Sequence, residues 1–310
     1  MFGSVVGQTV NFIDRRFILN IVLPSLAFWG GLALLAAQGV GWAAVSRWWA
    51  GRTGFEQALA VGGAVAGLLF FAFLIAGLVT SLTRLWEGYW PGRVGSWLAA
   101  RRAGRHIRRW ESLDLEDASQ YMRRFYGFPV QKADVLPTRL GNVLRAAEDY
   151  PGDDERYGMD AVFYWPRLYL VLPTDTRSLV EDHRSGLDRM VLLASLAVAF
   201  PPAALIVGVV AGTWWPAWAI AAAVALLVAV AAYLGAVSAA AAFGDVVRSC
   251  FDNYRRTLLG QLGFAQPGSL DAERKLWGAL KQQLYQRGTS DPSVLVLADP
   301  GSALEPAAGD

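Results

Sequence analysis

Four long stretches of the chain lack charged side chains, and polar segments separate them into two pairs. They run from Phe17 to Gln38, from Gln57 to Thr83, from Met190 to Thr213 and from Ala217 to Phe243. Because a helix needs about 20 mostly apolar residues to cross a bilayer, each stretch predicts a transmembrane helix. The sequence therefore predicts a mainly α-helical, polytopic membrane protein with four transmembrane helices in two hairpins.

The polar segments between and around these hairpins complete the predicted organisation. We expect a small α+β cytosolic module between the hairpins and cytosolic helices after the second hairpin. The six parts are an N-terminal cytosolic segment (1–16), the first transmembrane hairpin (17–85), a cytosolic insert (86–189), the second transmembrane hairpin (190–243), C-terminal cytosolic helices (244–296) and a disordered tail (297–310).

Composition agrees with a membrane protein. Of the 310 residues, 54% are hydrophobic and 17% are charged, and the mean hydropathy is +0.31, which is too apolar for an ordinary soluble enzyme. The formal net charge is only +2, so the molecule as a whole gives no argument for nucleic-acid binding. A bias toward Ala, Gly and Arg is typical of a GC-rich bacterial coding sequence.

The arginines indicate which side of the membrane the polar segments face. Many arginines follow the second apolar stretch, whereas the turn between the first two stretches holds only Arg47 and Arg52. By the positive-inside rule, the insert and both termini are cytoplasmic, and the location is the bacterial inner membrane. The start, DRRFILN, loosely resembles a twin-arginine export signal, but the length of the first apolar stretch and Pro24 within it favour a retained helix.

Small residues recur within the apolar stretches at a spacing that allows close helix contact. Gly63 with Gly67 and Ala231 with Gly235 are the two pairs. The pairs have two interpretations, which are packing within one protomer and a self-association face that builds a homo-oligomer. A pore between protomers would be lined by weakly polar side chains, and Asn20 and Ser25 are the candidates.

A cationic helix is predicted directly after the second apolar stretch, in RVGSWLAARRAGRHIRRW. Arginines spaced by three or four residues fall on one face of a helix. The candidate ligand-binding residues are Arg101, Arg102, Arg105, Arg108 and Arg109. They have two interpretations, which are contact with anionic lipid headgroups and a site for the phosphates of a nucleotide or oligonucleotide.

The insert also contains RAAEDYPGDDERYGMDAVFYWPRL, which is dense in carboxylates and aromatic residues. The run from Asp160 to Leu172 is rich in aromatic and β-branched residues and predicts a strand that Pro166 interrupts. Asp153, Asp154 and Glu155 are consecutive in a turn, so their side chains diverge. We expect a packed, ion-paired module here, with a partner or ligand surface and a catalytic centre as the alternatives.

Motifs for enzyme chemistry are lacking in this sequence, which holds no GxxxxGK[ST], HExxH, CxxC, GxSxG or dinucleotide fingerprint. Its one cysteine, Cys250, has no histidine near it in sequence and is expected to be a packed side chain. The apolar stretches contain no Asp, Glu, Lys, Arg or His, which disfavours an ion-coupled transporter. We therefore expect no enzyme, no cofactor and no metal site.

The segment PTRLGNVLRAAEDYP, followed by RYGMDAVFYWPRLYLVLP, resembles a segment of uncharacterised bacterial proteins that have paired spanning helices on both sides of it. This resemblance implies a recurring cytosolic unit and names no active residue. By architecture alone, the chain is also similar to oligomeric channel effectors of bacterial antiviral systems of the Hailong type.

These observations together predict a homo-oligomeric gated pore, or an ion-channel-like effector, in the inner membrane. An anionic ligand would regulate it at a cytosolic, arginine-rich vestibule. The alternative is a membrane-anchored scaffold that recruits a cytosolic protein partner through the insert without conducting. The expected partners are therefore the lipid bilayer, further copies of the chain, and either a nucleotide or oligonucleotide or a cytosolic protein.

Overall fold

A computed structural model describes residues 17–153, 156–285, 288 and 292–298. The predicted N-terminal segment and the tail from residue 299 onward lie outside these described residues. The chain forms two compact units. Unit 1 comprises residues 1–86 and 184–239, and unit 2 comprises residues 87–183 and 240–310.

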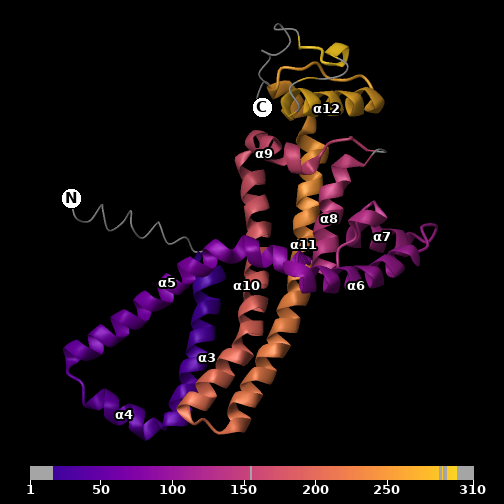
Figure 1. Ribbon diagram of the computed structural model, residues 1–310. Coiled ribbons are helices and arrows are strands. Elements are labelled where there is room, and N and C mark those ends of the chain that lie inside the picture. Colours follow the sequence, from indigo (N-terminus) through magenta and orange to yellow (C-terminus); the bar gives the residue numbers. More distant parts are fainter. Residues whose placement is uncertain (1–16, 154–155, 286–287, 289–291, 299–310) are drawn as a thin grey trace, which may run out of the picture. The chain divides into compact units, whose positions relative to one another are not determined.

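Among the described residues, four helices are long and apolar enough to cross a membrane, in agreement with the four predicted helical stretches (Figure 1). They are the π-helix η1 (Ile18–Val22) with α3 (Leu23–Val40), then α5 (Gly54–Glu87), α10 (Thr174–Ala211) and α11 (Trp215–Gln261). Helix α10 begins within the segment predicted as the insert and runs on into the third apolar stretch, because no helix-ending residue interrupts it.

Unit 1 is held together where α3 packs against α10 and α11. Leu32 and Leu35 of α3 are buried with Ala204 of α10. Glycines allow these helices to approach closely, because a Cβ on Gly208 would lie 2.7 Å from the indole of Trp218. The hydroxyl of Thr213, in the turn between α10 and α11, donates a 2.9 Å hydrogen bond to the carbonyl of Leu35.

The connection between α3 and α5 is a helix rather than the predicted turn. This helix, α4 (Trp42–Ala50), buries no residue. Figure 1 shows α5 diverging from α3 toward α4. The first half of α5 is consequently exposed, with Phe55 at 78% and Leu59 at 66%. Closer to its end, α5 contacts α3 through Phe71, whose ring centroid lies 5.5 Å from that of Trp29.

Unit 2 is built from short helices together with the first part of α10 and the last part of α11. A single bridge pairs Phe264 with Leu297, and the described residues otherwise contain no β structure. The short helices are α6 (Gly92–Glu111), α7 (Ala118–Gly127), η2 (Lys132–Asp134), α8 (Arg139–Asp149), η3 (Tyr150–Gly152), α9 (Ala161–Val171), α12 (Leu270–Tyr285) and η4 (Pro292–Val294).

The predicted strand over 160–172, and with it the α+β module, is wrong. This segment forms α9, capped by Asp160, whose carboxylate accepts a 3.0 Å hydrogen bond from the N–H of Phe163. Tyr164 and Leu168 are fully buried at helical spacing, so packing outweighs the strand preference of the aromatic and β-branched residues. Pro166 lies inside the helix and leaves the exposed turn before it without one backbone hydrogen bond.

The core of unit 2 joins segments that are far apart in the sequence. Phe251 of α11 and Trp277 of α12 are fully buried with Tyr164 of α9. The Tyr164 hydroxyl donates a 2.6 Å hydrogen bond to the carbonyl of Trp277. The predicted insert and the predicted C-terminal helices therefore fold as one unit.

Candidate functional site

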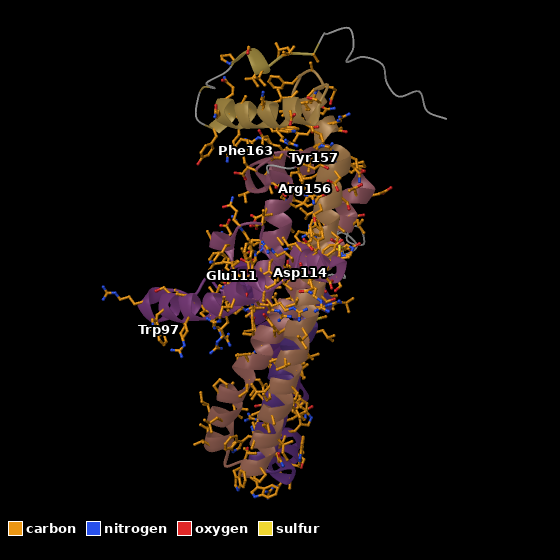
Figure 2. The ribbon with its side chains drawn as sticks, turned by 90° about the vertical axis from the view of Figure 1, so that its right-hand side faces the viewer. Trp97, Glu111, Asp114, Arg156, Tyr157 and Phe163 are labelled. Atoms are coloured by element: carbon orange, nitrogen blue, oxygen red, sulfur yellow. The ribbon has the colours of Figure 1, made fainter. Side chains whose placement is uncertain are left out.

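The predicted cationic segment forms α6, a helix with one packed side. The Trp110 indole N–H donates a 3.1 Å hydrogen bond to the carbonyl of Pro129, and the Arg124 guanidinium lies 3.3 Å from the centroid of its ring. The ring of His106 lies 6.4 Å from that of Phe128. Figure 2 labels Trp97 and Glu111, which belong to the two halves of this helix.

The opposite side of α6 carries the five predicted arginines, all of them exposed. We call Arg101, Arg102, Arg105, Arg108 and Arg109 the arginine face. No described carboxylate lies within ion-pair distance of any of them. Two of these arginines lie over tryptophan rings. The guanidinium carbon of Arg101 lies 5.6 Å from the centroid of the Trp97 ring, and that of Arg102 lies 5.8 Å from the centroid of the Trp90 ring, just before α6.

Three apolar side chains extend the arginine face toward the start of α6. Val94 is 72% exposed, Trp97 59% and Leu98 42%. At about 100° of rotation per residue, this apolar trio and the arginine face share roughly 140° of the helix circumference. One continuous surface therefore changes from apolar to cationic along the helix axis.

His106 does not add to this positive charge. Burial lowers its pKa, and the neighbouring charges of Arg109 and Arg102 lower it further. The imidazole is therefore neutral near pH 7, and the positive charge of this part of α6 comes from the arginines alone.

Several other basic side chains of unit 2 have carboxylate partners, unlike the arginine face. Arg255 binds Glu273 at 2.8 Å, and Lys281 binds Asp160. Arg145 contacts three carboxylates, those of Asp134, Glu148 and Asp149. Among the described residues, the arginine face has no such carboxylate partner.

The carboxylate-rich stretch singled out in the sequence lines a cavity of about 470 Å³ in unit 2. We call it the acidic pocket. Its charged lining residues are Asp134, Arg145, Glu148, Asp149, Asp153, Asp160 and Lys281. No group of three potential metal ligands occurs among the described residues, and Asp154 and Glu155 of the same stretch lie outside them.

The pKa values of two carboxyls of the acidic pocket, those of Asp149 and Asp160, are shifted in opposite directions. Burial raises the pKa of Asp149, although Arg145 opposes it. Burial also acts to raise the pKa of Asp160, but Lys281 and the N–H of Phe163 hold that pKa below its ordinary value. The carboxyls are thus largely engaged by residues of the same unit, which supports the prediction of a packed, ion-paired module.

A second polar network lies between the loop before α9 and the end of α11. The carboxylate of Asp252 accepts hydrogen bonds from the hydroxyls of Tyr150 at 3.0 Å and Tyr157 at 2.8 Å. Burial and the bond to Asp252 raise the pKa of Tyr157 to about 12. Figure 2 labels Tyr157 beside Arg156. The raised pKa keeps the Tyr157 hydroxyl protonated near pH 7, as the hydrogen-bond donor to Asp252.

The residues that carry the sequence resemblance have structural roles. The Thr138 hydroxyl accepts from the N–H of Gly141 at 3.0 Å and donates to the carbonyl of Glu87 at 2.8 Å. A Cβ at Gly141 would collide with that same carbonyl. The fully buried side chain of Asn142 bonds the N–H and the carbonyl of Leu136 at 2.7 and 2.9 Å. This segment fixes the start of α8 against Glu87 of the same unit.

The two predicted small-residue pairs, Gly63 with Gly67 and Ala231 with Gly235, lie in different surroundings. A Cβ at Gly235 would lie 3.1 Å from the sulfur of Met190, so this position packs inside unit 1, whereas Ala231 is exposed. At Gly63 and Gly67, a Cβ would meet no atom within 4 Å. No atom of the described residues therefore lies against the α5 pair.

The two candidate pore residues lie in the first span. Asn20 is half-buried in η1. Ser25 is fully buried, and its hydroxyl donates a 2.7 Å hydrogen bond to the carbonyl of Ile21. Because this hydroxyl is buried and bonded to its own helix, it is not exposed on a surface where another protomer could bind.

Comparison with protein-family models, curated proteins and solved structures finds no match for this chain.

The sequence interpretation identified the arginines but not Val94 and Leu98, which share their surface. Val94 and Leu98 are four residues apart and precede Arg101 and Arg105 at helical spacing, so the pattern was present in the sequence. The acidic pocket was not predictable in the same way. Lys281 reaches Asp160 from a helix more than a hundred residues away, and no spacing rule connects them.

Proposed function

We propose that this chain is a bacterial inner-membrane protein that presents unit 2 to the cytosol and binds a phosphate-bearing partner on the arginine face of α6. The observation that carries this proposal is the exposure of five arginines on one helix side, without a carboxylate partner among the described residues. Such a protein is a membrane-anchored scaffold, whose partner is recruited by charge.

Arginine suits this role because its guanidinium holds phosphate oxygens with two parallel hydrogen bonds and stays charged at every physiological pH. When arginine repeats along one side of a helix, each guanidinium can bind a further phosphate, and the attractions add. The free energy gained is about 1 kcal/mol per basic residue at an anionic surface. Five residues together are enough for stable but salt-sensitive binding.

A polyphosphate chain carrying a fluorescent label tests the proposal, with the purified protein in neutral detergent. The variant Arg101→Glu/Arg105→Glu/Arg108→Glu should bind this probe about 100-fold more weakly than the unchanged protein, given about 1 kcal/mol for each lost contact. The control Arg123→Glu/Arg139→Glu/Arg256→Glu makes the same change in net charge at exposed arginines elsewhere. Equal affinity of the two triple variants for the probe would contradict an arginine-face site.

A homo-oligomeric gated pore is the second candidate, and one observation favours it. Gly63 and Gly67 present a small-residue surface of α5 that nothing described in the chain covers. Copies of α5 could approach closely there, as small-xxx-small pairs allow in membranes. Ion flux from liposomes that contain the assembled protein tests this candidate. A correctly assembled oligomer that conducts no ions would favour the scaffold.

A further inference from the structure

We infer that the partner of the arginine face is the membrane itself, so that α6 lies in the interface of an anionic bilayer and binds phospholipid headgroups. This inference rests on the proposed function, because it names the source of the phosphates. It also assigns a role to the apolar trio, which the proposed function leaves unused.

The first argument is the distribution of side chains along α6. A helix that lies in a bilayer surface buries one side at the boundary between headgroups and acyl chains, and its basic side chains reach the phosphates. Here the first half of α6 exposes Val94, Trp97 and Leu98, and the second half exposes the arginine face. Tryptophan is the residue type most typical of this depth.

The second argument comes from the chain itself. The candidate span α5 ends at Glu87, and α6 begins at Gly92. Five Cα–Cα steps cover at most about 18 Å, so the first turn of α6 starts within that distance of the end of a span. The apolar trio belongs to the first two turns, which this short connection keeps close to the end of the span.

The third argument separates lipid from a soluble nucleotide or oligonucleotide. Sites for small soluble ligands are concave and enclose most of the ligand, whereas the arginine face is an exposed helix side. An oligonucleotide would occupy the arginines and could stack a base on Trp97, but it gives Val94 and Leu98 no apolar environment. A layer of anionic headgroups over acyl chains satisfies both halves of the surface.

Depth-dependent quenching in nanodiscs tests the inference with the full-length protein. The variant Leu98→Cys carries an environment-sensitive dye on the apolar trio, and Ser96→Cys carries it roughly 160° around the same helix. The native Cys250 is 1% exposed, so the label goes to the introduced thiol. In nanodiscs of phosphatidylglycerol and phosphatidylcholine, doxyl-labelled lipid should quench the dye at position 98 several-fold more than at position 96.

Two further measurements decide the lipid source. Replacing phosphatidylglycerol by phosphatidylcholine, or introducing Arg101→Glu/Arg105→Glu/Arg108→Glu, should reduce the quenching at position 98 toward the value at position 96. The scattered control Arg123→Glu/Arg139→Glu/Arg256→Glu should leave it unchanged. Equal quenching at the two positions in every nanodisc would overturn the inference. Arginine-dependent binding of the polyphosphate probe would then still stand, so failure of the inference and failure of the proposed function give different results.

Discussion

Arg255 and Glu273 form an ion pair in the interior of unit 2, with 2.8 Å between the guanidinium Nε and the carboxylate Oε1, and the side chain of Glu273 is 1% exposed. The pair joins the end of α11 to α12. The indole N–H of Trp277 donates to the same oxygen at 3.3 Å, while Oε2 is buried without a hydrogen-bond partner among the described residues. A carboxylate removed from water to this extent depends on its cation.

Breaking this pair should destabilise unit 2 strongly. Arg255→Ala leaves the Glu273 carboxylate buried without its cation, which costs about 3–5 kcal/mol and lowers the Tm on the order of 10 °C. Thermal unfolding of the detergent-solubilised protein, followed by intrinsic fluorescence, measures the change.

The double variant Arg255→Met/Glu273→Leu is the matched control for this prediction. It removes both charges and keeps apolar volume in the core, so its Tm should lie well above that of Arg255→Ala. A double variant as unstable as the single one would show that packing, rather than the uncompensated charge, causes the loss.

Two glycines of α3 should respond differently to the same substitution. A Cβ at Gly39 would lie 2.6 Å from the carbonyl oxygen of Ala211 and would collide with the Thr213 hydroxyl, whereas a Cβ at Gly30 would meet nothing within 4 Å. Gly39→Ala should therefore cost about 1–3 kcal/mol, because α3 must move away from the turn between α10 and α11. Gly30→Ala should be neutral or slightly stabilising, since alanine is the better helix former. Similar Tm values for both variants would refute this close contact.

The acidic pocket predicts opposite pH effects for two aspartates. Asp149 has a raised pKa in the folded protein, so the unchanged protein loses stability as pH rises from the ordinary value of 3.8 through that higher pKa. Asp160 has a lowered pKa, so its contribution is present above 3.8 and is lost as pH falls through the lower folded value.

Melting curves between pH 2 and 7 test these two signs. Relative to the unchanged protein, the Tm of Asp149→Asn should increase with rising pH, and the Tm of Asp160→Asn should decrease. A parallel pH dependence of the two variants would contradict the assigned shifts. Each comparison uses the same protein at all pH values, so a constant effect of the lost ion pair cancels.

The open glycine pair of α5 predicts the behaviour of any oligomer. Gly63→Leu should reduce self-association in detergent at least several-fold if copies meet at this surface, because the added side chain prevents close backbone approach. Ala58→Leu is the control, since Ala58 is exposed on the opposite side of the same helix. Sedimentation velocity measures the oligomer fraction, and equal fractions for the two variants would exclude this pair as the contact.

Local patterns predicted the helices but not every connection between them. The four spans follow from uninterrupted apolar composition. The helix α9 was mistaken for a strand because aromatic and β-branched residues favour strands in general, while Tyr164 and Leu168 form a helix in order to reach the core shared with α11 and α12.

The candidate site was also partly predictable from the sequence and partly decided by the tertiary structure. Helical spacing by itself determined that the arginines share one side of α6, because that depends only on the period of the helix. The tertiary structure decided which charges remain available, because ion pairing depends on residues that the fold brings together from distant positions. Lys281 therefore pairs with Asp160 and Arg255 with Glu273, and the arginine face is left without such a partner among the described residues.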